Sequence, residues 1–241
     1  MLRLAGAGLL AAGVAACGGD EKTTAKSGVA KAASLAERTD SEALTWKEAR
    51  KRLEEGNLRF AEAQAAHPDQ STGRRRKLNS GGQKPFAIVL ACADSRVPPE
   101  LIFDQGLGDL FVVRSAGHVV DRAVLGTVQF GVEEFATPLL VVLGHTKCGA
   151  VKATLEAIEK KTVTTGTDVD LLVTTIRPAV VEAEEMGAKG EDILPVAIDN
   201  NVERTVALLS QARLLTVAVK SRKLRILGAV YDLATGEVSF M

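Results

Sequence analysis

Short, almost wholly apolar runs alternate with amphipathic segments in the central part of the chain. Residues 86–91, 110–113 and 138–143 carry no charged side chain and are rich in Val, Leu, Ile and Phe. Runs of this kind are typical of strands buried on both faces. Residues 121–135 precede the third run, and their apolar side chains recur at helical spacing behind Asp121, a candidate N-cap. The order strand, helix, strand predicts a parallel sheet with covering helices.

An amphipathic helix is predicted ahead of this sheet, over residues 45–66. Thr45 and Glu48 have the spacing of a capping box, and Pro68 favours an end near Ala66. The fold class is therefore α/β, with a mostly parallel central sheet covered by helices and a long N-terminal helical arm. The pattern also predicts helices over 150–160, 169–186 and 201–219, with a kink or break at Pro178, and strands over 225–231 and 237–240.

The first 42 residues have a different composition. Residues 1–16 are mostly small and apolar, with Arg3 as the charged residue among them. This segment is too short to span a bilayer as a helix, but its length and composition suit a signal peptide. Val14-Ala15-Ala16-Cys17 resembles a bacterial lipobox, which implies lipidation at Cys17; the alternative is an apolar first helix with an incidental cysteine. We expect a lipoprotein-type signal peptide at 1–17, a flexible linker at 18–42 and a catalytic domain at 43–241. The protein would be exported and anchored on the periplasmic side of the cell envelope.

Charge and cysteine content narrow the function classes. Thirty basic and thirty acidic residues leave zero formal net charge, which gives no support for nucleic-acid binding. The basic run 74–77 is interpreted as a solvated loop before a strand. The three cysteines do not suggest a disulfide framework. Gly144 to Gly149 has the glycine spacing of a P-loop but lacks the Lys-Ser/Thr pair that should follow.

The residues that follow the buried runs can bind a metal. Cys92 follows the first run, and His145 and Cys148 follow the third. Loops at the carboxyl ends of parallel strands share one crevice, so these residues are expected to meet. Two thiolates and an imidazole suit tetrahedral zinc, and three protein ligands leave the fourth position open for catalysis. The alternative is a pair of small core cysteines and a structural histidine.

Asp94 and Arg96 stand beside this candidate site. They flank Ser95 just after Cys92, and arginine can hold a carboxylate through two parallel hydrogen bonds. The pair can therefore support the metal site from outside. A plain surface ion pair in a turn is the alternative.

Two motifs resemble the paired signatures of β-class carbonic anhydrases. These are Cys92-Ala93-Asp94-Ser95-Arg96-Val97-Pro98 and His145-Thr146-Lys147-Cys148-Gly149. The resemblance implies one Zn²⁺ per subunit on Cys92, His145 and Cys148, with Asp94 as a fourth ligand in a closed state only. It also implies that Asp94 orients a zinc-bound hydroxide and that Arg96 holds Asp94. The implied substrate-binding residues are Gln83, Gly149, Phe111, Ala116 and Phe130.

The reaction implied by the resemblance is reversible hydration of CO2 to bicarbonate and a proton. Hydrolysis of a related small molecule such as carbon disulfide remains an alternative on the same scaffold. A non-catalytic zinc- or bicarbonate-binding module is another. The resemblance further implies a homodimer or a larger even oligomer, with the helix over 45–66 available to wrap a partner subunit. We expect no nucleic-acid partner, and membrane contact only through the lipid anchor.

Overall fold

A computed structural model describes residues 44–161 and 166–241. The expected signal peptide at 1–17 and linker at 18–42 lie outside the described residues. Within them, the first helix begins at Trp46 and the last strand ends at Phe240. The predicted α/β class is confirmed.

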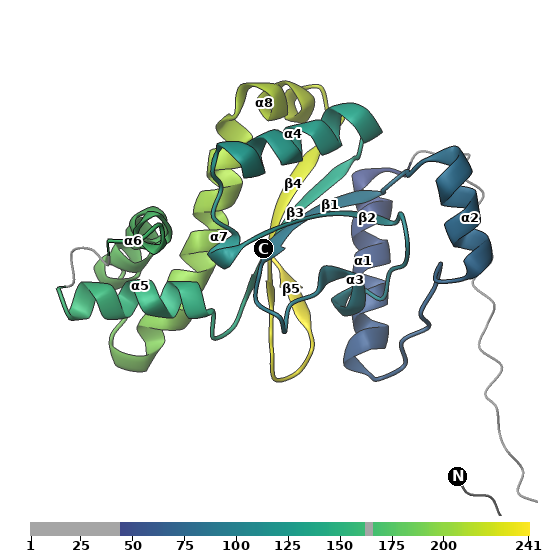
Figure 1. Cartoon of the computed structure of the whole chain (residues 1–241). Helices are drawn as coiled ribbons and strands as arrows, with labels where there is room; N and C mark the ends of the chain where they lie inside the picture. Colours follow the sequence, from purple (N-terminus) through teal and green to yellow (C-terminus); the bar gives the residue numbers. More distant parts are fainter. Residues whose placement is uncertain (1–43, 162–165) are drawn as a thin grey trace, which may run out of the picture. The chain divides into compact units, whose positions relative to one another are not determined.

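The sheet has five strands in the order β2-β1-β3-β4-β5. Neighbours are parallel from β2 to β4, and β5 runs antiparallel to β4 (Figure 1). The bounds are β1 (Ala87–Cys92), β2 (Leu110–Ser115), β3 (Leu139–His145), β4 (Arg225–Tyr231) and β5 (Val238–Phe240). The three apolar runs thus form adjacent parallel strands, as their composition predicts.

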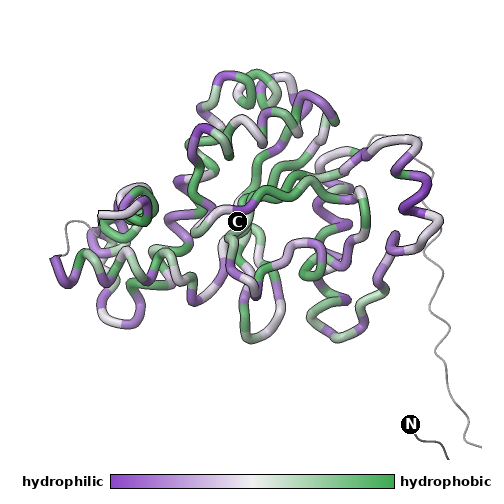
Figure 2. Tube along the Cα trace, viewed as in Figure 1, coloured by the Kyte–Doolittle hydropathy of each residue, from purple (hydrophilic) through white to green (hydrophobic). Residues whose placement is uncertain are grey.

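Each central strand contributes to two hydrophobic clusters. Along β1, Val89 and Ala91 pack on one face of the sheet, and Ile88 and Leu90 pack on the other. The first cluster includes residues of α1 (Trp46–Ala61) and α3 (Pro99–Ile102). The second is closed by α4 (Arg122–Phe135), α7 (Ile193–Gln211) and α8 (Arg213–Lys220). The strands are accordingly the most continuously apolar part of the trace in Figure 2, because both their faces are covered.

A third cluster lies where the strands end. It joins Cys92 and Cys148 to apolar side chains of α5 (Gly149–Glu159), α6 (Val169–Glu185) and α7. Two short 3₁₀ turns belong to the same region, η1 (Ala116–His118) and η2 (Gly190–Asp192). The two cysteines therefore pack against helices α5, α6 and α7 on one side. Among the described helices, none has the length and apolar character needed to cross a bilayer.

Helix α1 packs on its own chain. Ala49 and Leu53 are fully buried against the sheet. Asn57 donates to the carbonyls of Ile102 and Gly236 at 3.1 and 2.8 Å and accepts from the Val238 N–H. These contacts fix one face of α1 within its own chain, while Leu58 of the same helix is 58% exposed.

The end of α1 differs from the prediction. The capping box at Thr45 and Glu48 is present, but the helix ends at Ala61 instead of Ala66. Ala63 takes a left-handed conformation (φ 56°). The buried carboxylate of Asp104 then accepts the backbone N–H groups of Ala66 and His67, both at 2.9 Å. A tertiary contact at Ala66 and His67 therefore competes with continuation of the helix.

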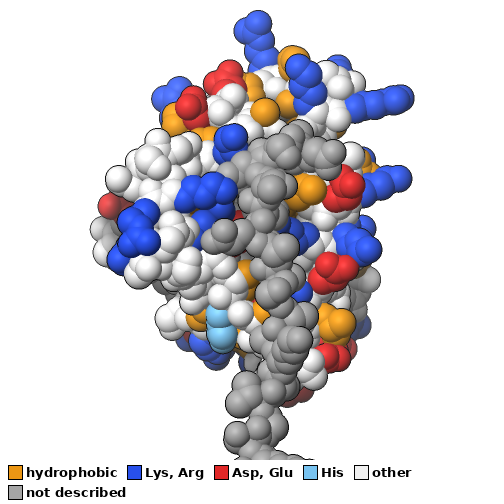
Figure 3. All heavy atoms as spheres, turned by 90° about the vertical axis from the view of Figure 1, so that its right-hand side faces the viewer, with side chains coloured by type: hydrophobic (Ala, Val, Ile, Leu, Met, Phe, Trp, Pro, Cys, Tyr) orange, Lys and Arg blue, Asp and Glu red, His pale blue; other side chains and the backbone are white. Residues whose placement is uncertain are grey.

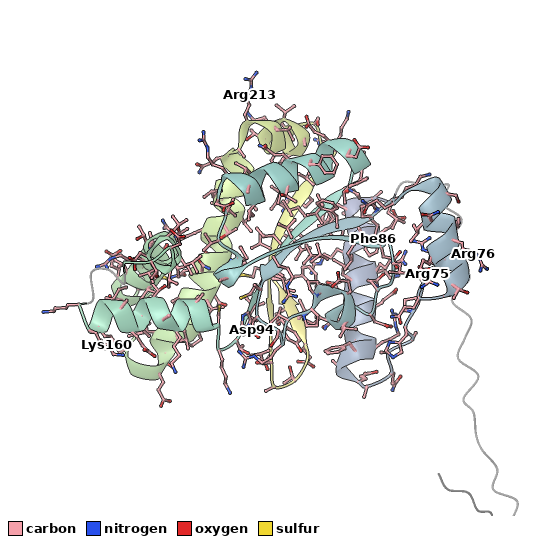
Figure 4. All side chains as sticks on the ribbon, viewed as in Figure 1. Arg75, Arg76, Phe86, Asp94, Lys160 and Arg213 are labelled. Atoms are coloured by element: carbon pink, nitrogen blue, oxygen red, sulfur yellow. The ribbon has the colours of Figure 1, made fainter. Side chains whose placement is uncertain are left out.

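The interpretation of residues 74–77 as a solvated loop is wrong. They lie in α2 (Thr72–Gly81), which Ser71 caps by accepting the Arg74 N–H. Arg74 is 7% exposed; its guanidinium donates to the Leu107 carbonyl and pairs with the buried Asp109 at 3.4 Å. Its neighbours Arg75 and Arg76 are exposed and are labelled in Figure 4. Figure 3 shows both basic and acidic side chains on this side of the molecule.

Two further helix predictions need correction. Pro178 lies inside the unbroken α6. Pro178 and Thr174 are exposed, so water can satisfy the carbonyl that the missing N–H leaves free. The predicted helix over 201–219 is two helices, α7 and α8, because Ala212 between them is extended (ψ 123°).

Candidate metal centre

Neighbouring strand ends bring two predicted ligands together. Cys92 ends β1 and His145 ends β3, and these strands are paired in parallel. Cys148 is the N-cap residue of α5, three residues further on. The two sulfurs and a ring nitrogen of His145 all lie within 4.8 Å of one another. The structure therefore places Cys92, His145 and Cys148 in one group, as the crevice argument predicts.

The imidazole of His145 is arranged as a ligand. Its Nδ1 lies 2.9 Å from the Thr146 carbonyl, so Nδ1 carries the proton and donates it to that oxygen. The other ring nitrogen, Nε2, has no hydrogen-bond partner although the side chain is fully buried. A buried nitrogen with a free lone pair costs free energy unless it binds something. Its position among two sulfurs points to a metal ion.

The surroundings of Cys92 favour its thiolate. The N–H groups of Asp94 and Gly117 donate to its Sγ at 3.4 and 3.3 Å. A hydrogen bond from Cys148, together with these two N–H donors, lowers the pKa of Cys92 well below its usual value. The same contact raises the pKa of Cys148, while the N–H groups at the start of α5 act in the opposite direction. A cation bound between the two sulfurs would favour the thiolate form of both, because a metal binds the deprotonated ligand.

The donor set fits zinc. Two thiolates and one imidazole match the soft and borderline ligands that zinc prefers in tetrahedral sites. Both cysteines are 4% exposed, so the ligands are shielded from bulk water. Three protein ligands leave one coordination position for a substrate or water, which distinguishes a catalytic site from a closed structural one.

Asp94 and Arg96 form a bidentate pair at the edge of this group. Arg96 donates from Nε and Nη2 to the two carboxylate oxygens at 2.9 and 2.7 Å, and its N–H donates as well. The Arg96 hydrogen bonds hold the pKa of Asp94 well below its usual range. Oδ2 of Asp94 lies 3.9 Å from Nε2 of His145, beyond hydrogen-bond distance. Asp94, labelled in Figure 4, is thus an ionised acceptor that Arg96 holds beside the group.

Two supporting groups are absent from the sequence-based prediction. Arg114, near the end of β2, donates to the carbonyls of Cys92 and Asp94 at 3.0 and 2.6 Å and so fixes the loop that carries both. The sequence offered one indication of a role for Arg114, because it is the charged residue of a mostly apolar strand. The Gly117 N–H on Cys92 had no signal, since it is a backbone group.

The expected substrate-binding residues fall into two sets. Ala116 begins η1 beside Cys92, and Gly149 is the exposed first residue of α5 next to Cys148. These two lie at the carboxyl ends of the strands, with the metal group.

Gln83, Phe111 and Phe130 lie elsewhere in the chain. Gln83 is exposed and precedes β1, whereas Cys92 ends it. The strand alone separates its two ends by about 17 Å at ~3.3 Å per residue. Phe86 and Asp94, labelled in Figure 4, mark these two ends. Phe111 pairs with Ile88 near the start of β1 and packs on Phe130, ring centroids 6.2 Å apart. One chain does not bring these three residues to its own metal group.

Comparison with known proteins identifies the class. A family model described as carbonic anhydrase matches residues 87–238. A carbonic anhydrase of Mycolicibacterium smegmatis is 43% identical over 190 residues, covering 78% of this chain and 89% of the relative. Carbonic anhydrase 2 of Mycobacterium tuberculosis is 43% identical over 187 residues, covering 77% and 88%.

Solved structures agree with the fold. The β-carbonic anhydrase CcaA superposes with a TM-score of 0.61 at 26% identity, covering 80% of this chain and 87% of that one. A Coccomyxa β-carbonic anhydrase in complex with acetazolamide gives 0.62 at 27% identity, covering 77% and 82%. The chain belongs to the β-carbonic anhydrase family, whose members use zinc.

Proposed function

We propose that Cys92, His145 and Cys148 hold the zinc ion at which this enzyme hydrates CO2 reversibly to bicarbonate and a proton. The observation that carries the assignment is the buried, unpartnered Nε2 of His145 within 4.8 Å of both sulfurs. When bound, zinc lowers the pKa of a water molecule from about 15.7 toward about 7, which makes a nucleophile available at neutral pH.

Asp94 and Arg96 orient the reaction. The lowered pKa keeps Asp94 ionised at neutral pH, so its carboxylate accepts a hydrogen bond and cannot donate one. This acceptor fixes the attacking oxygen with a lone pair toward CO2. Arg96 holds the carboxylate in one orientation through two bonds. With both oxygens bonded to Arg96, Asp94 acts here as an acceptor and does not serve as the fourth ligand.

Ala116 and Gly149 are the substrate-binding residues that lie next to the metal group of their own chain. We assign Ala116 to the apolar surface that admits uncharged CO2. The N–H of Gly149 belongs to the first turn of α5, whose N–H groups have no partner within the helix. It is positioned to donate to an oxygen of the developing bicarbonate.

Stopped-flow CO2 hydration by the purified chain tests this function. We expect the rate to fall to the buffer background when a chelator removes the zinc, and to return when zinc is restored. Sulfide release from carbon disulfide, measured on the same samples, tests the alternative hydrolase. Full hydration activity after complete zinc removal would contradict the proposal, as would no hydration by the zinc-loaded protein at neutral and mildly alkaline pH.

We propose in addition that two copies of the chain complete each substrate site. Gln83, Phe111 and Phe130 lie away from their own metal group, and Phe130 is 53% exposed. A second copy that covers this surface can bring the three side chains to the zinc of its partner. This predicts a dimer or a larger even oligomer. Gln83→Ala should lower kcat/KM without changing the zinc content. A protein that is monomeric by light scattering and still fully active would contradict the proposed shared site.

We also propose that the chain is an exported lipoprotein, modified at Cys17 and held at the cell envelope. The small apolar residues before Cys17 support this. Expression in a bacterial host with radiolabelled palmitate tests it. Label should enter the wild type and not Cys17→Ser; a soluble, unlabelled wild-type protein would overturn the assignment.

A further inference from the structure

A buried amide from α7 reaches the turn that follows β2. Asn201 is 6% exposed, and its Nδ2 donates to the Gly117 carbonyl at 3.1 Å. The same nitrogen lies 3.3 Å from Nδ1 of His118. One side chain thus holds two consecutive residues that precede it by more than eighty positions in the sequence.

The turn needs such support, because both of its residues are left-handed. Gly117 has φ 60° and His118 has φ 46°. The left-handed region is uncommon for residues other than glycine and persists where the surroundings determine it. The ring of His118 is 3% exposed, and its burial lowers its pKa to about 4. The ring is therefore neutral, and Nδ1 can accept the hydrogen bond from Asn201.

The same turn contacts a zinc ligand directly. The N–H of Gly117 donates to Sγ of Cys92 at 3.3 Å. The carbonyl of Gly117 accepts the hydrogen bond from Asn201. Because the carbonyl and the N–H of Gly117 are joined through its Cα, the bond to the carbonyl restricts the direction in which the N–H points. Asn201 thus acts on the sulfur through one backbone residue.

Helix α7 is itself fixed against β3 at this point. A Cβ added to Gly144, the residue before His145, would overlap the Val202 side chain. Val202 is fully buried and follows Asn201 in the sequence. The amide is therefore presented from a helix that packs directly on the strand that supplies another ligand.

We infer that Asn201 is a positioning residue of the zinc site. It holds the Gly117–His118 turn so that the Gly117 N–H donates to the Cys92 thiolate. This inference rests on the zinc site of the proposed function. Groups that support metal ligands in this way typically change metal affinity by about 10- to 100-fold when they are removed.

Asn200 offers a matched control. It is the preceding residue of α7, it is also 6% exposed, and its Nδ2 also donates to a backbone carbonyl, that of Ala179 at 3.3 Å. Ala179 lies in α6, which contacts Gly117 through the Ile176 side chain, but its carbonyl makes no hydrogen bond to the turn. Asn200→Ala removes a comparable buried hydrogen bond without touching a group that donates to Cys92.

Two measurements test the inference on the full chain. The first is the rate of zinc release to an excess of a chromogenic chelator, and the second is the sulfur-to-cobalt charge-transfer band of the Co²⁺-substituted protein. We expect Asn201→Ala to release zinc about 10-fold faster or more and to shift the band. Asn200→Ala should stay close to the wild type in both. Asn201→Asp, which keeps the shape and when ionised cannot donate, should behave like Asn201→Ala and serves if the alanine variant does not fold.

The outcomes separate this inference from the proposed function. Wild-type protein that binds no zinc contradicts the proposed function itself. Wild-type protein that binds zinc, while folded Asn201 variants release it at the wild-type rate, overturns only the inference. Equal acceleration in the Asn200 and Asn201 variants also overturns it, because general loosening of α7 would then be the cause.

Discussion

Cys148→Ser is expected to lose its stoichiometric zinc and to hydrate CO2 no faster than buffer. The Cys148 sulfur lies within 4.8 Å of the Cys92 sulfur and of a ring nitrogen of His145, in a group that is 4% exposed or less. A serine hydroxyl does not ionise at neutral pH and is a harder donor than a thiolate, so only two good ligands remain. The loss of zinc affinity should exceed the about 100-fold that removal of an outer group can cost. Zinc content after dialysis and the hydration rate measure the result.

Cys17→Ser is the matched control for this change. It replaces a cysteine of the same chain outside the proposed site and should leave the zinc content and hydration rate of the purified protein at wild-type values. A Cys148→Ser protein that retains both zinc and activity would remove Cys148 from the ligand set.

Asp94→Asn is expected to keep zinc and to lose most of the catalytic rate. Asp94 is not one of the three ligands, but both its oxygens accept from Arg96 at 2.9 and 2.7 Å. An asparagine places an NH2 group against one of the Arg96 donors, so the pair cannot form in the same way. It also removes the negative acceptor that orients the nucleophile. Misplacement of a reacting group can cost about 10²-fold, and we expect kcat/KM to fall by at least that order.

Arg96→Lys separates orientation from charge. Lysine keeps the positive charge but not the fork that fits a carboxylate. We expect an activity between those of the wild type and Asp94→Asn, with zinc content unchanged in both. An Asp94→Asn enzyme with wild-type kcat/KM, or one that has lost its zinc, would mean that Asp94 does not have the proposed role.

The sheet and the ligands could be predicted from sequence because local patterns determine them. Apolar runs without alternation indicate strands covered on both faces, and the carboxyl ends of parallel strands meet at one edge. This rule alone predicts that Cys92 and His145 lie together. The Asp94–Arg96 pair was equally accessible, because both residues lie within one short loop.

Other features depended on contacts that no local pattern shows. Residues 74–77 have the composition of a solvated segment, and Arg74 is 7% exposed because Asp109 and the Leu107 carbonyl bind its guanidinium. Helix α1 ends early because Asp104, far along the chain, takes the backbone N–H groups of Ala66 and His67. Asn201 is one of several polar residues on α7, and its contact with Gly117 depends on the packing of α7 on β3.

X-ray absorption at the zinc edge of the purified enzyme tests the ligand set most directly. The account predicts one zinc per chain with two sulfurs at about 2.3 Å, one imidazole nitrogen and one further light atom near 2.0–2.2 Å. Absence of stoichiometric zinc, or a shell with fewer or more than two sulfurs, would contradict it.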